Sequence, residues 1–218
     1  MSLGLASNPM TLALLTPCHD GMYHSNYCDL LTYAAGKKNF VLMKSEYESC
    51  IARHRSKMAS TFLTDPRFKD CQGYITIDAD IGVRDHRMLD RLASLPWDMD
   101  IVGGVYVKKD GSGSIVVRGL TEERHPVDPN IVKVECVPTG FTRYSRRVVQ
   151  AVYDSKRVPN CRHEWRMVYD ARIMESSLGL GYESEDYAFC LDAGALGYKC
   201  WLDRCIRLTH RGFTLYKA

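Results

Sequence analysis

The chain has 218 residues, of which 45% are hydrophobic and 25% charged. This length suits one domain with a large core, and the composition excludes a disordered or collagen-like protein and a long repeat array. The 29 basic and 26 acidic residues give a net charge of only +3. The sequence therefore does not predict a nucleic-acid-binding protein or a membrane-surface protein.

Cysteine usage and hydropathy predict the compartment. Nine cysteines show no paired Cys-x-x-Cys pattern and follow no secretory signal, so we expect reduced thiols and a cytoplasmic protein. The longest apolar runs, residues 12–15 and 101–107, are much shorter than the roughly 20 residues of a membrane-spanning helix. We expect a soluble protein without a membrane span.

In chain order, residues 1–9 have no periodicity and are expected to form a flexible lead-in to a single domain at 10–218. Apolar runs predict strands at 11–16, 39–43, 73–77 and 100–107, the last interrupted by Gly103-Gly104. Helical spacing predicts helices at 26–35, 49–63 and 87–94. This alternation of strands and helices favours an α/β sandwich around a mostly parallel sheet, with ligands beyond the carboxyl ends of the strands.

The second half is less regular. Residues 108–124 are polar and rich in glycine, with a short strand expected at 114–117 and another at 132–137. Helices are predicted at 146–153 and 185–196 and a strand at 199–202. Residues 155–181 carry no motif, and strands of opposite sense are expected in this half.

The Asp78-Ala79-Asp80 segment directly follows the apolar strand at 73–77. Two carboxylates beyond a buried strand can hold a hard divalent cation, which in turn binds phosphate oxygens. They could also simply cap a turn. In a third reading Asp78 is the phospho-acceptor nucleophile of a phosphatase, although such enzymes carry Thr or Val where this chain has Gly82.

Arg55 falls inside the apolar stripe of its predicted helix, whereas Arg53 points away from it. An inward-facing arginine needs an anion. That anion could be a buried carboxylate or the phosphate or base end of a nucleotide.

Three further positions allow a functional and a structural interpretation. Glu185 and Asp186 follow the expected N-cap Ser184, where acids complement the helix dipole but could also act as a general base. His210 lies 130 positions after Asp80 and is either a structural histidine or a ligand favouring manganese. Gly140 would let a ligand approach the backbone or form an ordinary turn.

Several ordered segments together resemble the nucleotide-diphospho-sugar transferases of the GT-A fold, in particular glycosyltransferase domains of chloroviruses. The matching segments are residues 53–56 and 62–63, 77–82, 102–106, 185–190, 197–201 and 209–212. The Arg-Asn pair of the family appears here as Arg55-Ser56. The resemblance implies a three-layer α/β/α sandwich with a nucleotide-binding half at about 10–107 and an acceptor-side half at about 108–218.

The resemblance also implies roles for individual residues. Asp80 and His210 would bind Mn²⁺ or Mg²⁺, with Asp78 near the ribose or a metal-bound water, and Asp186 would be the catalytic base with Glu185 as its alternate. The donor nucleotide would be held by Pro17, His19, Asp20, Arg55, Asp78, Ala79, Asp80, Gly104 and Gly140.

We therefore expect a metal-dependent, inverting glycosyltransferase that moves a sugar from a UDP-sugar, such as UDP-glucose or UDP-rhamnose, to a hydroxyl of a glycan acceptor. If the protein is viral, the acceptor would belong to a viral glycoprotein, the compartment would be the host cytoplasm, and further glycosyltransferase domains could follow in a longer chain. Acceptor specificity is expected within residues 155–181. The alternatives are a magnesium-dependent phosphatase or nucleotidyltransferase using the two aspartates, and a non-catalytic nucleotide-sugar-binding module.

Overall fold

The structure, a computed structural model, describes residues 11–156, 165–212 and 215–217. The expected lead-in at 1–9 lies outside the described residues. A large mixed sheet forms the centre of the molecule, with strand order β2-β1-β3-β8-β5-β11-β7-β6. These strands are β1 (Thr11–Cys18), β2 (Phe40–Glu46), β3 (Cys71–Ile77), β5 (Ile101–Val105), β6 (Arg124–His125), β7 (Asp128–Val134), β8 (Phe141–Ser145) and β11 (Cys200–Arg211).

Most of the central strands run in the same direction. β1 is parallel to β2 and β3, and β5 is parallel to β11. β8 lies antiparallel between β3 and β5, so those two also share one direction. The short strands β4 (Ile81–Val83) and β12 (Leu215–Lys217) pair with the far end of β11. The expected mixed, mostly parallel α/β sheet is confirmed.

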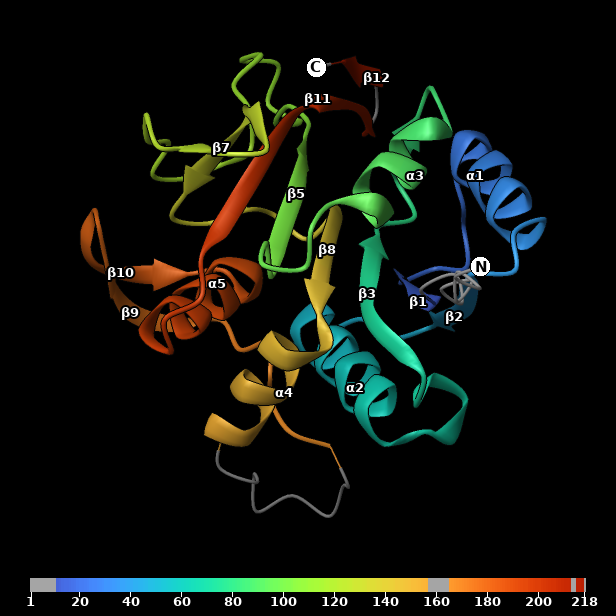
Figure 1. Cartoon of the computed structure of the whole chain (residues 1–218), viewed down its shortest axis with the longest axis horizontal. Coiled ribbons are helices and arrows are strands. Elements are labelled where there is room, and N and C mark those ends of the chain that lie inside the picture. Colours follow the sequence, from blue (N-terminus) through green and yellow to red (C-terminus); the bar gives the residue numbers. More distant parts are fainter. Residues whose placement is uncertain (1–10, 157–164, 213–214, 218) are drawn as a thin grey trace, which may run out of the picture.

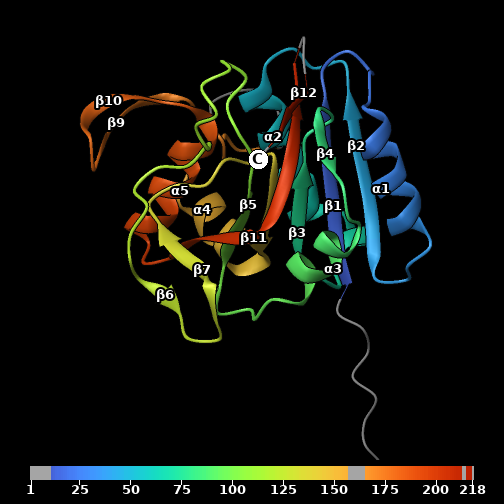
Figure 2. The same ribbon diagram turned by 90° about the horizontal axis from the view of Figure 1, so that it is seen from above.

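Helices cover both faces of this sheet (Figure 1, Figure 2). Successive residues of β1 point to opposite faces, so Ala13 and Leu15 belong to one buried cluster and Leu12 and Leu14 to the other. The first cluster includes buried side chains of α2 (Ile51–Thr64), α4 (Arg146–Ser155) and α5 (Glu185–Ala195). The second includes those of α1 (Ser25–Ala35) and α3 (Arg87–Ser94). The result is three layers. A short 3₁₀ helix, η1 (Pro66–Phe68), follows α2.

The expected elements differ from the structure in several places, and β8 was not expected at all. Gly103 and Gly104 do not interrupt β5, because their missing side chains leave room for Thr142 and for Ile206, respectively. The expected strand at 114–117 is reduced to an isolated bridge between Val107 and Ile115. β11 extends well beyond the expected 199–202, and the motif-free stretch contains a hairpin of β9 (Arg172–Ser176) and β10 (Gly179–Glu183).

The topology brings two polar segments to one edge of the sheet. β1 and β3 are parallel neighbours, so the residues that follow Cys18 and Ile77 leave the sheet on the same side. Ligands of open α/β sheets bind at this edge. Within the described residues, no helix has the length and apolar character needed to cross a membrane.

Candidate functional site

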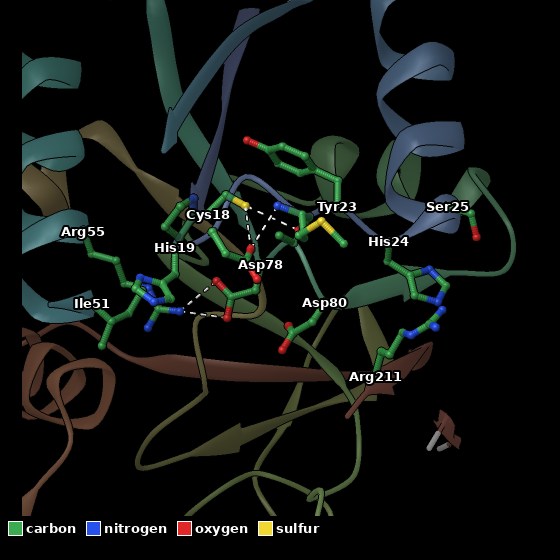
Figure 3. Close-up of a pocket in the computed structure, with 14 residues that line it drawn as sticks. Cys18, His19, Tyr23, His24, Ser25, Ile51, Arg55, Asp78, Asp80 and Arg211 are labelled. Atoms are coloured by element: carbon green, nitrogen blue, oxygen red, sulfur yellow. Dashed lines mark hydrogen bonds and ion pairs between the residues drawn. The ribbon is translucent and has the colours of Figure 1, made fainter. Parts of the chain in front are cut away.

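A pocket of about 610 Å³ opens at this carboxyl edge (Figure 3). The segments after β1 and β3, the start of α2 and the end of β11 form its walls. Seven residues predicted for nucleotide binding line it: Pro17, His19, Asp20, Arg55, Asp78, Ala79 and Asp80. Seven others were not predicted as nucleotide-binding residues: Cys18, Met22, Tyr23, His24, Ser25, Ile51 and Arg211.

Arg55 connects the Asp78 carboxylate, which follows β3, to the Glu185 carboxylate at the start of α5. Its side chain is only 7% exposed, whereas that of Arg53 is 48% exposed, which confirms the predicted orientation of both. Nη2 donates to the two carboxylate oxygens of Asp78 at 2.7 and 2.8 Å, and Nη1 donates to Glu185. The sequence left open whether Arg55 meets a protein carboxylate or a nucleotide. In the structure, its partners are two protein carboxylates.

The charges of this cluster depend on one another. Burial works against the charged form of Arg55, but the nearby Asp78 and Glu185 carboxylates more than offset it, and the pKa of Arg55 lies above its usual value. Burial raises the pKa of Glu185 above its ordinary range, and the Arg55 charge offsets only part of this effect. Removing Arg55 would leave two carboxylates without their counter-ion.

His210 and Asp80 meet although 130 positions separate them. β4 pairs with β11 so that Ile81 lies opposite His210, and the Arg211 amide donates to the Asp80 carbonyl at 2.9 Å. The His210 Nε2 atom lies 3.8 Å from a carboxylate oxygen of Asp80. The strand pairing, rather than sequence proximity, thus brings these two predicted ligands together.

The surroundings of His210 favour a tautomer that can bind a metal. Its Nδ1 lies 2.9 Å from the Val107 carbonyl, which can only accept a hydrogen bond. Burial lowers the pKa of His210 below its usual value, which favours the neutral ring. Nδ1 then carries the proton, and the lone pair of Nε2 faces the Asp80 carboxylate. Two acceptors facing each other in this way suit a cation between them.

Asp80 and His210 could hold a divalent cation only if it takes further ligands from a bound molecule or water. No group of three or more His, Cys, Asp or Glu side chains suitable for a metal occurs in the described part of the chain. Asp80 and His210 supply two ligands, whereas Asp78 is engaged by Arg55. Magnesium-type sites commonly use one or two carboxylates and complete their shell with phosphate oxygens and water. Lys109, whose ammonium contacts Asp80, would have to move aside.

Glu185 and Asp186 begin α5 but do not line the described pocket. Ser184 occupies the predicted N-cap position, yet its hydroxyl contacts the Asp186 carboxylate instead of capping the helix. The Tyr187 amide donates to the same carboxylate at 2.8 Å. Asp186 is therefore held in place by its own helix, while Glu185 is oriented by Arg55.

Gly140 and Gly104, which were predicted to contact the nucleotide, instead pack against other residues of the protein. Gly140 lies against Tyr106: its amide donates to the Tyr106 hydroxyl at 3.1 Å, and a Cβ atom would lie 2.5 Å from that oxygen. Its carbonyl accepts from the Asp78 amide at 3.0 Å. Gly104 packs against Ile206: a Cβ atom at position 104 would lie only 2.5 Å from the Ile206 Cγ2 atom. Neither glycine lines the described pocket, so their predicted direct contact with the nucleotide is not seen.

Tyr106 and Lys109 are two neighbours of the site that sequence reasoning missed. The Tyr106 ring packs edge-on against His210 with centroids 5.0 Å apart, and its hydroxyl contacts Gly140. Tyr106 thereby links His210 to Gly140, whose carbonyl contacts the Asp78 amide. Tyr106 lies in the motif segment 102–106, which is the one signal that could have indicated it; Lys109 lies in a polar stretch without a pattern.

These features define a mixed α/β protein with a polar pocket at the carboxyl edge of its sheet. No protein-family model matches the chain, and no curated protein matches its sequence. The fold is similar to that of the crystal structure of A197 from STIV, with a TM-score of 0.58 and 15% sequence identity. The match covers 95% of this chain and 94% of that chain, so the likeness in fold extends over nearly the full length of both.

Proposed function

We propose that this protein is a metal-dependent, inverting glycosyltransferase of the GT-A fold. It would transfer a sugar from a UDP-sugar, such as UDP-glucose or UDP-rhamnose, to a hydroxyl of a glycan. The observation that carries the proposal is the Arg55 bridge between Asp78 and Glu185. It joins the pocket at the end of β3 to the start of α5, where the acceptor would be activated.

The pocket has the size of a small-molecule site, and Arg211 offers a cation to a diphosphate. A pocket of about 610 Å³ lies within the range that small-molecule ligands occupy. Tyr23 and Ile51 offer apolar surface for the base, while Arg211 and His24 line the same pocket near Asp80 (Figure 3). The guanidinium of Arg211 would bind phosphate oxygens.

A cation held by Asp80 and His210 would neutralise the charge that develops on the departing diphosphate. This chain's residues would do the remaining work. Tyr106 packs against His210, and Arg55 holds Asp78 fixed beside the pocket. Asp186, oriented by Ser184 and the Tyr187 amide, would take the proton of the acceptor hydroxyl as it attacks the anomeric carbon. One displacement without a protein nucleophile inverts the anomeric configuration.

The geometry argues against Asp78 as a phosphatase nucleophile. Both of its carboxylate oxygens accept from Nη2 of the buried Arg55. An attacking carboxylate needs an oxygen free to approach phosphorus, and a strong charge-assisted pair lowers its nucleophilicity. The arrangement suits a positioning role for Asp78 better.

Calorimetric titration tests the donor site directly. UDP, GDP and UDP-sugars would be titrated with and without Mn²⁺ into the wild-type protein and the Asp80→Asn variant. We expect UDP-selective binding that requires both the metal and Asp80. Absent or metal-independent nucleotide binding would overturn the proposal, and phosphate release from simple esters would favour the phosphatase.

A further inference from the structure

A second cavity adjoins the site described above, because Val107, whose carbonyl contacts His210, lines it. It has a volume of about 400 Å³ and is formed by β5, β11, β12 and the segment at 107–120. Among the described residues, none lines both this cavity and the larger pocket. Its apolar wall consists of Val105, Val107, Ile115, Leu120 and Leu202. This wall ranges from the fully buried Leu202 to Leu120, which is 59% exposed.

Three cations share the cavity with this apolar wall: Arg204, Arg207 and Lys217. None of the lining residues that the structure describes is acidic. In the described ranges, none of the three side chains has an ion pair or hydrogen bond, although most arginines of this protein have one. All three are exposed, and their combined positive charge would attract an anion to the cavity.

The backbone of β11 explains how the arginines come to lie there. β11 follows β5 in register up to Asp203 opposite Gly104, and the next pair is Arg207 opposite Val105. Residues 204–206 of β11 therefore have no partner in β5. An irregularity of this kind changes the direction in which the side chains point. Arg204 lies within this irregularity, Arg207 directly follows it, and both line the cavity. Lys217 comes from β12, which pairs with β11 through Thr209.

We propose that this cavity binds a single-chain anionic amphiphile, that is, a phosphate or carboxylate attached to an aliphatic chain. The cations would hold the head group, and the aliphatic chain would cover Leu120, Ile115 and Val107. A volume of about 400 Å³ lies in the range of small-ligand pockets that combine an apolar wall with a few polar groups. The site is independent of the proposed transfer reaction.

Calorimetry with monomeric decyl phosphate tests the proposal on the full chain. We expect saturable binding that UDP with Mn²⁺ does not displace. Inorganic phosphate and decyltrimethylammonium, which lack the chain and the negative charge respectively, should each bind at least tenfold more weakly. Decanoate separates the two head groups: binding equal to that of decyl phosphate indicates a carboxylate site as well, and weaker binding indicates a phosphate site.

Variants locate the binding. Arg204→Gln/Arg207→Gln should weaken decyl phosphate binding at least tenfold, and Leu120→Ser, at an exposed position, should weaken it severalfold. Arg67→Gln, an exposed arginine on η1 outside the cavity, is the matched control and should leave binding unchanged. The proposal is overturned if no saturable binding occurs, if UDP displaces the ligand, or if the double variant binds like the control.

Discussion

Arg55 and Glu185 form an ion pair across 130 positions of sequence, and the same guanidinium holds Asp78 through a second nitrogen. The pair joins the middle of α2 to the first residue of α5. Because Arg55 is buried and the two carboxylates are largely shielded from water, its charge supports both the stability of this region and the geometry of the site.

Replacing Arg55 should be costly for stability. Arg55→Met leaves Asp78 and Glu185 without their shared counter-ion, and breaking a buried pair in this way costs about 3–5 kcal/mol. Arg53→Met, in the same helix but largely exposed, should cost less than about 1 kcal/mol. Urea unfolding of both variants gives the comparison. Equal effects would show that the bridge contributes no more than a surface ion pair.

Lys109 should compete with a metal at Asp80. Its ammonium contacts the carboxylate that would bind the cation, so Lys109→Ala should increase Mn²⁺ affinity in the absence of nucleotide. An exposed pair of this kind is worth about 0.2–1 kcal/mol, which corresponds to at most about a fivefold gain. Mn²⁺ binding followed by electron paramagnetic resonance measures it, with Lys108→Ala as the control. An unchanged affinity would contradict the competition.

Asp186 should matter for turnover and not for donor binding. Asp186→Asn should lower kcat for sugar transfer by about 10²–10⁴, the usual contribution of a general base, and leave UDP affinity within about twofold. Asp70→Asn, an exposed acid just before β3 and at the opposite end of that strand from the pocket, should leave both unchanged. Full transfer by Asp186→Asn would move the base to Glu185 or elsewhere. A wild-type protein that binds UDP-sugars without any transfer would indicate a binding module.

His54 should contribute to acid sensitivity. It is buried in α2, and burial lowers its pKa below the usual 6.5. Between pH 6.5 and the lower pKa of the folded state, the unfolded state binds more protons than the folded state. The free energy of unfolding therefore falls as the pH falls below 6.5. His54→Gln should make this decrease shallower between pH 7 and 5. Unfolding curves at several pH values would show it, and an identical slope in the variant would contradict the prediction.

Local patterns were sufficient for much of the fold. Apolar runs ending in turn residues predicted β1 and β3, and the 3.6-residue spacing predicted which face of α2 carries Arg55. Both features depend on neighbours within a few residues. β8 was missed because a short strand between a turn and a helix has too few residues for periodicity, and its antiparallel position between β3 and β5 depends on distant partners.

The amino-acid sequence by itself determined the class of fold, the edge of the sheet where the polar segments gather and the inward face of Arg55, because these follow from side-chain periodicity and strand polarity. Only the tertiary structure decided which anions Arg55 meets, that β4 and β11 bring His210 to Asp80, and that Lys109 reaches the same carboxylate. Those contacts join segments tens to more than a hundred residues apart, and their geometry is set by strand register and packing rather than by local sequence.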